Sequence, residues 1–176
     1  GQETPDGEIT RFAVDVNHRC DTTDGPLLIG RIQYQSNVDV VAHRSPHDIN
    51  GDGRLDLFWQ HERDGWIAAW EMQGTRLVTA RLTNPSRVAD TNWRIIGTAD
   101  FNADGRPDLF WQNRQTGTLA VWYMNGTTFL APGVLSTSTV SDLNWQIRAI
   151  ADFNADSRPD LLWQHQVTGA LAVWIL

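Results

Sequence analysis

Short apolar runs separated by glycine, asparagine and aspartate make up most of this chain, and they predict β-strands. Between residues 92 and 135 we expect strands at 92–99, 109–112, 119–124 and 129–135. The pair Asn125-Gly126, a strong hairpin signal, separates the last two. The runs Leu-Phe-Trp and Leu-Ala-Val-Trp are apolar at consecutive positions, which is typical of strands covered on both faces. No stretch of the sequence keeps a helical period, so the pattern predicts an all-β protein.

The same pattern returns at a fixed spacing of 52 residues. Residues 48–56 read Asp-Ile-Asn-Gly-Asp-Gly-Arg-Leu-Asp, and related segments follow at 100–108 and 152–160. Residues 92–122 and 144–174 share 21 identities in 31 positions. Four short strands per unit, covered on both faces and repeated, predict β-propeller-type blades of four antiparallel strands. We expect three units at about 38–90, 91–142 and 143–176.

Residues 1–37 do not follow the repeat. Strands are expected at 9–16 and 27–34, and by counting back from the first unit, 27–34 falls where a fourth strand belongs and 38–42 where a first strand belongs. These N-terminal strands therefore either close the last unit or form a degenerate preceding blade. Propellers close with about four to eight blades. Three clear units leave three alternatives, namely a ring completed by oligomerisation, a fragment of a larger propeller, or an open arc.

Each repeated acidic segment places oxygen-bearing side chains at loop positions 1, 3, 5 and 9. Alternate residues of a tight loop point toward one centre, as in the first half of an EF-hand loop, and the backbone carbonyl at position 7 adds another oxygen. Oxygen donors without sulfur or imidazole favour Ca²⁺ over zinc or copper. We therefore expect up to three structural Ca²⁺ ions whose binding contributes to folding. The expected ligands are Asp48, Asn50, Asp52, Arg54 and Asp56; Asp100, Asn102, Asp104, Arg106 and Asp108; and Asp152, Asn154, Asp156, Arg158 and Asp160, where each arginine supplies its carbonyl.

The charge of the chain fits this interpretation. The net charge is -7, and nine of the 21 acidic residues lie in the three loops, so that removing them would change the net charge to +2. The acidity is thus concentrated where cations would bind. A negative chain also argues against nucleic acid as a partner. No apolar run reaches the ~18 residues of a membrane helix, so no membrane insertion is expected.

Two alternatives to calcium loops deserve comparison. Asp/Asn/Gly turns can cap their own backbone, but turn capping does not by itself demand an aspartate at position 9. An EF-hand or dockerin-type helix–loop–helix is disfavoured by the β-rich flanks and by tryptophan in place of glutamate at position 12. Gly53 and Gly105 stand where the turn needs a positive φ, whereas the third loop carries Ser157. That serine costs about 1 kcal/mol, so we expect the third site to be the weakest.

The pattern Asp-Phe-Asn-x-Asp-Gly-x-x-Asp-Leu-x-Trp-Gln, followed by Thr-Gly and Val-Trp-x-Met-x-Gly, resembles the FG-GAP/VCBS repeats of bacterial secreted and surface proteins. These repeats are similar to the calcium-binding blades of integrin α-chains. The resemblance covers about residues 38–176 and is most specific over 92–126 and 144–174. It implies a β-propeller, Ca²⁺ in the blade loops and a secreted or cell-surface location. Some relatives are lectins and others adhesins or modules appended to enzymes, so the resemblance leaves the ligand open.

Eight of the nine tryptophans recur in register and are expected to pack in the core. Trp66 is the exception, because threonine and alanine stand at its equivalent positions and it follows the Asp64-Gly65 turn. Trp66 is therefore a candidate ligand-binding platform. The alternative is a partly exposed tryptophan that caps the first blade.

Together these features favour a calcium-stabilised, non-enzymatic recognition module for a carbohydrate, with adhesion to a protein as a close alternative. In the rival class, the chain is a catalytic or accessory part of a secreted hydrolase with its chemistry in residues 1–47. Asp15, His18, His43 and His47 would then be the first candidates, although no nucleophile motif or phosphate-binding glycine loop accompanies them. A third class, a purely structural assembly unit, predicts a homo-oligomer that completes a propeller ring.

Overall fold

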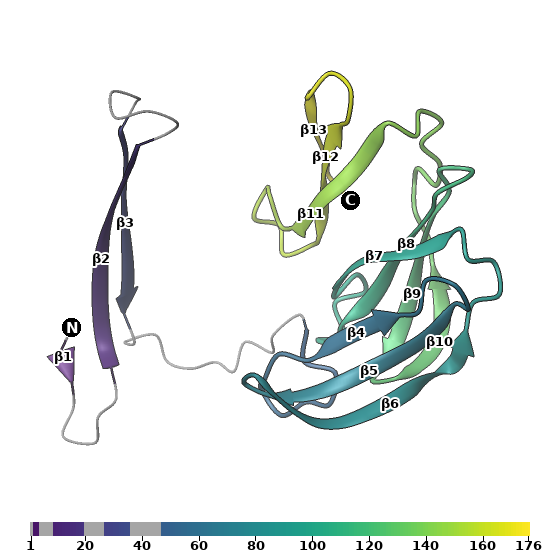
Figure 1. Cartoon of the computed structure of the whole chain (residues 1–176), viewed down its shortest axis with the longest axis horizontal. Helices are drawn as coiled ribbons and strands as arrows, with labels where there is room; N and C mark the ends of the chain where they lie inside the picture. The colour runs from purple at the N-terminus through teal and green to yellow at the C-terminus, as the bar shows by residue number, and fades with distance from the viewer. Residues whose placement is uncertain (1, 4–8, 20–26, 36–46) are drawn as a thin grey trace. The chain divides into compact units, whose positions relative to one another are not determined.

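The computed structural model describes residues 2–3, 9–19, 27–35 and 47–176. Every regular element in these residues is a β-strand, as Figure 1 shows, so the all-β class is confirmed. Within the same residues there is no helix of the length and apolarity that crossing a membrane requires. The chain divides into two compact units, Gly1–His43 and Arg44–Leu176, which are described separately.

The first unit contains one antiparallel sheet of three strands, β1 (Gln2–Glu3), β2 (Ile9–Arg19) and β3 (Leu27–Gln35). β2 and β3 form a long hairpin whose register runs from the pair Arg11 and Gln35 to the pair Arg19 and Leu27. The strands expected at 9–16 and 27–34 are therefore confirmed. The strand expected at 38–42 lies outside the described residues.

The second unit contains three antiparallel meanders, one for each repeat. The strands expected at 92–99, 109–112, 119–124 and 129–135 are all present, with ends that differ by at most two residues. The positions of glycine and asparagine in the sequence thus predict the turns correctly. The meanders are β4 (Leu57–Gln60), β5 (Trp66–Gln73) and β6 (Arg76–Arg87); β7 (Trp93–Ala99), β8 (Asp108–Asn113), β9 (Leu119–Asn125) and β10 (Thr128–Gly133); and β11 (Trp145–Ala151), β12 (Asp160–His165) and β13 (Leu171–Trp174).

The sheet connectivity agrees only partly with separate four-stranded blades. The first two meanders join into one seven-stranded sheet of order β4-β5-β6-β10-β9-β8-β7, through a parallel contact between Thr128 and Asn84. The third meander forms a three-stranded sheet of its own. Among the described residues only the middle repeat has four strands. In the second unit the structure therefore establishes one mixed and one antiparallel sheet, and it does not separate them into propeller blades.

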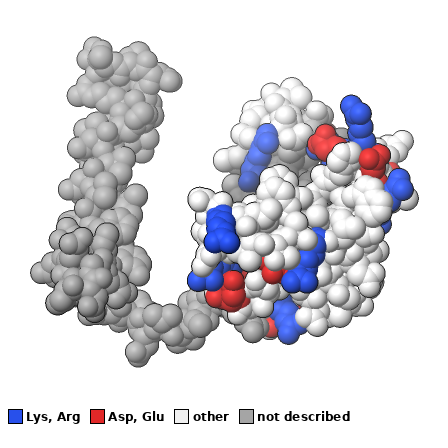
Figure 2. All heavy atoms as spheres, turned by 60° about the horizontal axis from the view of Figure 1, so that its bottom comes forward, with Lys and Arg blue, Asp and Glu red and all other residues white. Residues whose placement is uncertain are grey.

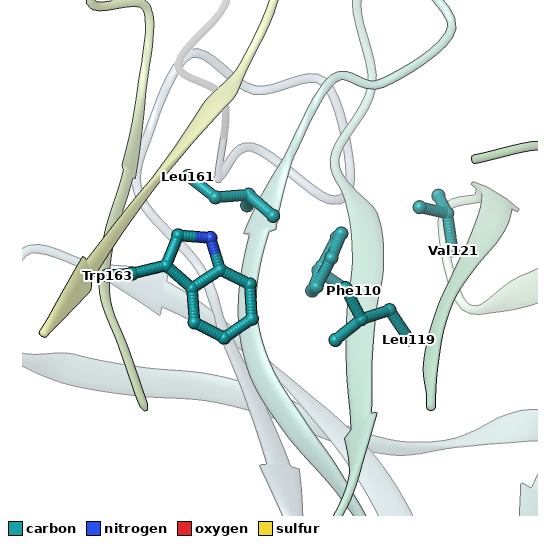
Figure 3. Close-up of a cluster of buried hydrophobic side chains, with 5 residues drawn as sticks. All are labelled: Phe110, Leu119, Val121, Leu161 and Trp163. Carbon is teal, nitrogen blue, oxygen red and sulfur yellow. The ribbon is translucent and has the colours of Figure 1, made fainter. Parts of the chain in front are cut away.

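The apolar core lies between successive repeats. One buried cluster joins Ile67 of β5 to Leu109 and Trp111 of β8. A second cluster, drawn in Figure 3, joins Phe110 of β8 to Leu161 and Trp163 of β12. The consecutive residues 109–111 therefore face opposite repeats in alternation, which explains why this strand is apolar at every position. The two-sided burial expected for these strands is confirmed for β8.

The tryptophans repeat one packing arrangement in all three meanders. A tilted ring pair connects the two strands that follow each acidic loop, with centroid separations of 4.8, 4.9 and 4.9 Å. These pairs are Trp59 and Trp70, Trp111 and Trp122, and Trp163 and Trp174. Trp111 and Trp163 are buried, as expected. The expectation is wrong for Trp59, which is half exposed because no described element covers its face of β4.

Candidate functional site

The three acidic loops adopt one conformation with two left-handed residues each. The second loop connects β7 to β8 and the third connects β11 to β12, while the first precedes β4. At position 6 the φ angles are positive, as the sequence predicts, including that of Ser157 at 68°. Position 4 is also left-handed, which the sequence does not reveal where alanine stands there. The residues at positions 4 and 6 are Gly51 and Gly53, Ala103 and Gly105, and Ala155 and Ser157.

The oxygens at positions 1, 3 and 5 accept hydrogen bonds from the backbone of their own loop. In the second loop, the two carboxylate oxygens of Asp100 accept the N–H groups of Gly105 at 2.7 Å and of Asp104 at 3.0 Å. Asn102 Oδ1 also accepts the N–H of Asp104, at 3.0 Å, and Asp104 Oδ1 accepts that of Arg106 at 2.9 Å. The first and third loops repeat this arrangement. Each loop thus gathers three oxygen-bearing side chains around its own backbone.

The aspartate at position 9 has a different role, because it links its loop to the end of the second strand after that loop. Asp108 is fully buried, and its Oδ2 accepts the N–H of Phe101 at 2.9 Å while its Oδ1 accepts that of Met124 at 2.8 Å. Asp56 and Asp160 make the equivalent pairs of bonds. The aspartate at position 9 therefore has a structural role that requires no bound ion. An aspartate at position 9 therefore does not by itself distinguish a calcium-binding loop from a turn that caps its own backbone.

The electrostatics of the second loop follow from this burial. Burial raises the pKa of Asp108 to about 6, against the opposing hydrogen bonds from Met124 and Phe101, and the nearby charges of Asp104 and Asp100 raise it further. Like charges close together disfavour the ionised carboxylate. The surroundings of Asp108 therefore disfavour its ionised form.

The side chains of the loops fit a calcium ion in their chemistry. All donors are oxygens, and in the second loop the charges of Asp104 and Asp100 help to raise the pKa of Asp108. Within residues 47–176, however, no three carboxylate, imidazole or thiol groups converge to hold an ion in this geometry. In this geometry the oxygens at positions 1, 3 and 5 of the second loop accept hydrogen bonds from backbone N–H groups. The fifteen predicted ligands therefore remain a prediction.

Charged side chains do not form a large patch of one sign on the face that Figure 2 shows, where acidic and basic residues are interspersed. Several of them are paired, such as Arg81 with Glu71 at 2.8 Å and Arg54 with Asp52 at 3.5 Å. On this face the negative net charge of the chain is not spread as a continuous acidic surface.

A groove of about 410 Å³ lies beside the third meander, between β12 and β13 and the segment that precedes β11. Trp145, Trp163 and Trp174 supply aromatic rings to its lining, with Ala172 and Val140. Its polar lining consists of Thr137, Thr139, Ser141 and Asp142. Aromatic surface beside a few polar groups is the usual composition of a small-molecule site.

The sequence interpretation missed Asp142 and its equivalent Asp90. Asp142 accepts the N–H of Asn144 at 3.0 Å and pairs with His165 Nε2 at 3.0 Å. The hydrogen bonds from Asn144, followed by that from His165, lower the pKa of this exposed carboxyl below its ordinary value. The signal was present in the sequence, because Asp-x-Asn-Trp recurs at the 52-residue spacing.

The other candidate residues do not gather into one site. Trp66 is 43% exposed at the start of β5, as expected for a turn aromatic. His47 is half buried, its Nδ1 hydrogen-bonds Thr98 Oγ1, and burial lowers its pKa. His43 lies outside the described residues. Asp15 and His18 lie on β2, where the structure gives no side-chain surroundings.

Comparison with known proteins agrees with the repeat geometry. A model of the FG-GAP-like repeat matches residues 48–111 and again residues 100–163, two overlapping stretches whose starts are 52 residues apart. Each match begins at one acidic loop and ends at the tryptophan that follows the next loop. No curated protein and no solved structure matches the chain. Repeats of this kind generally bind calcium. Since the matches span residues 48–163, the chain belongs to the FG-GAP-like repeat family.

Proposed function

We propose that the protein is a calcium-stabilised, non-catalytic recognition module of propeller-type blades, located outside the cell, and that its ligand is a carbohydrate. The three meanders with apolar contacts between successive repeats support the blade arrangement. In such an arrangement each sheet buries its faces against its neighbours. The finer geometry of a closed propeller is part of this proposal.

In the proposed module, the oxygens at positions 1, 3, 5 and 9 of each loop and the carbonyl at position 7 would hold one calcium ion. When bound, the ion would supply positive charge to a loop whose carboxylates repel one another. The position-9 aspartates would then connect the ion to the second strand after each loop, through the bonds that they already make to Met72, Met124 and Leu176. Extracellular modules bind calcium with dissociation constants of about 0.1–1 mM, which suits a secreted or cell-surface location.

The observation that carries the carbohydrate proposal is the groove beside the third meander. It combines the partly exposed rings of Trp145 and Trp174 with threonine and serine hydroxyls and the Asp142 carboxylate, whereas Trp163 lines it but is only 1% exposed. Sugar rings offer apolar C–H faces and many hydroxyls, so a site for them needs both aromatic surface and hydrogen-bonding groups. Trp66 is the second candidate position, because its ring is exposed beside a turn.

A glycan array with the calcium-loaded chain tests this proposal. Trp174→Leu removes a ring from the groove but keeps an apolar side chain, and we expect binding to fall at least about tenfold. Trp70→Leu is the matched control, because Trp70 occupies the equivalent position of the first repeat and does not line the groove. Far-UV circular dichroism checks that each variant folds.

The outcomes separate the alternatives. Loss of binding on Trp66→Ala, with Trp174→Leu unaffected, would move the site to the turn before β5. A wild-type chain that binds no glycan at ample calcium would contradict the carbohydrate proposal. Calcium binding is a separate question, because a melting temperature that is lowered by EDTA and restored by Ca²⁺ more than by Mg²⁺ reports on the loops alone.

A further inference from the structure

At one end of the repeat array, β12 and β13 expose an apolar surface whose equivalent in the preceding repeat is buried. We call it the β13 face, and it consists of Leu162, Leu171 and Val173. Leu171 and Val173 are 66% and 45% exposed, whereas their equivalents Leu119 and Val121 are 3% and 2% exposed. The equivalent of Leu162 is Phe110, which is fully buried. The same positions are therefore core in the middle repeat and surface in the last one.

The opposite end of the array shows the complementary feature. The β4 face, defined as Leu57 and Trp59, is 42% and 47% exposed. The equivalent leucine and tryptophan of the other two repeats are at most 1% exposed. Those equivalents are Leu109 and Trp111, and Leu161 and Trp163. The first repeat thus presents at its surface a leucine–tryptophan pair that each following repeat buries.

Inside the chain, these two kinds of face always meet each other. Phe110, Leu119 and Val121 of the middle repeat pack against Leu161 and Trp163 of the last one, the cluster of Figure 3. The junction between the first and middle repeats is built in the same way. There Ile67, which is equivalent to Leu119, packs in one cluster with Leu109 and Trp111. Both internal junctions use the same register positions. The natural complement of the β13 face is therefore a β4 face.

We propose that the β13 face of one chain packs on the β4 face of a second copy, with the contacts that already join successive repeats within the chain. The two faces differ, so the association is head-to-tail and not an isologous pairing of identical patches. Two copies joined at both pairs of faces bring six repeats into one ring, within the four to eight blades of known propellers. This association depends neither on the carbohydrate ligand nor on the occupancy of any loop.

The mass of the chain in solution tests the proposal directly. Light scattering after size exclusion, at ample calcium, is expected to give twice the chain mass of 19.8 kDa. Val173→Glu and Leu57→Glu each place a charge in the contact, and we expect either change to weaken the dimer at least about 30-fold. Val167→Glu, in the turn before β13, and Leu77→Glu, on β6 and 42% exposed like Leu57, are matched controls that should stay dimeric.

Mixing the two disrupted variants tests the head-to-tail geometry. The Val173→Glu chain keeps an intact β4 face, and the Leu57→Glu chain keeps an intact β13 face, so an equimolar mixture is expected to form a dimer through the one intact contact. Circular dichroism confirms that each variant folds. A monomeric wild type, an open-ended series of larger species, or a mixture that stays monomeric while each variant is folded would overturn the proposal.

Discussion

Replacing Gly117 by alanine should destabilise the protein several times more than replacing Gly169, although these glycines occupy the same position of successive repeats. Both have a left-handed backbone, with φ of +71° and +72°, so alanine costs about 1 kcal/mol at either position through its backbone alone. The surroundings differ. A Cβ at Gly117 would lie 1.9 Å from the carbonyl oxygen of Val140, whereas nothing lies within 4 Å of a Cβ at Gly169.

The clash at Gly117 involves backbone and cannot be relieved by a rotamer change. Val140 also donates its N–H to the carbonyl of Gly117 at 3.0 Å, so moving this segment away weakens that hydrogen bond. Overpacking costs about 1–3 kcal/mol and a lost hydrogen bond about 0.5–1.5 kcal/mol. We therefore expect Gly117→Ala to cost about 3–5 kcal/mol in the free energy of unfolding, and Gly169→Ala about 1 kcal/mol.

Urea unfolding followed by tryptophan fluorescence, at constant calcium, measures both costs from the midpoints and slopes. Gly65→Ala provides a second test, because its Cβ would lie 1.9 Å from the carbonyl oxygen of Val88. It should resemble Gly117→Ala. Equal costs at Gly117 and Gly169 would refute the reasoning, since the two sites share their backbone conformation and differ only in what the new methyl group meets.

Three further outcomes are expected. Ser157→Gly should stabilise the chain by about 1 kcal/mol, because it relieves a positive φ, while Ser136→Gly at an exposed position without that strain should not; thermal melting compares them. In calcium titrations by calorimetry, Asp104→Ala should cost more affinity than Asp156→Ala if the loop with serine is already the weakest; an equal or reversed order contradicts that ranking. Asp142 has a lowered pKa in the folded chain, so its contribution to stability is present above its ordinary value of 3.8 and is lost as the pH falls through the lower, folded value. The part of the stability difference between wild type and Asp142→Ala that depends on the Asp142 charge, measured by urea unfolding, should therefore be present at neutral pH and be lost in acid.

The strands of the middle repeat could be predicted almost to the residue, because the signals that define them are local. Asn125-Gly126 ends one strand, and both glycines at 117 and 126 have positive φ. The alternation along β8 also follows from the sequence, since a strand that is apolar at every position must be covered on both faces. What the sequence does not determine is which face has a neighbour. Trp59 and Trp111 occupy the same repeat position, yet one is half exposed and the other buried.

The acidic loops show the same limit at the level of single side chains. Spacing alone identified the loops and the left-handed residue at position 6. It did not reveal the second left-handed residue, because Ala103 and Ala155 carry no glycine signal. Nor did it reveal that Asp108 bonds the N–H of Met124, since that partner lies 16 residues further along the chain. A contact between a side chain and a distant backbone group becomes visible only once the third strand is in place.

The repeated acidic motif therefore serves two purposes that are coupled through charge. Asp104 is exposed and bonds only within its loop, whereas Asp108 is buried and fixes the loop to the end of β9. The pKa of Asp108 is raised to about 6 by burial and by the charges of Asp104 and Asp100. The link between the loop and β9 at neutral pH thus depends on the Asp108 carboxylate, and the surroundings of Asp108 disfavour its ionised form. A cation placed among these three residues would offset the charges of Asp104 and Asp100, which fits the proposed calcium ion.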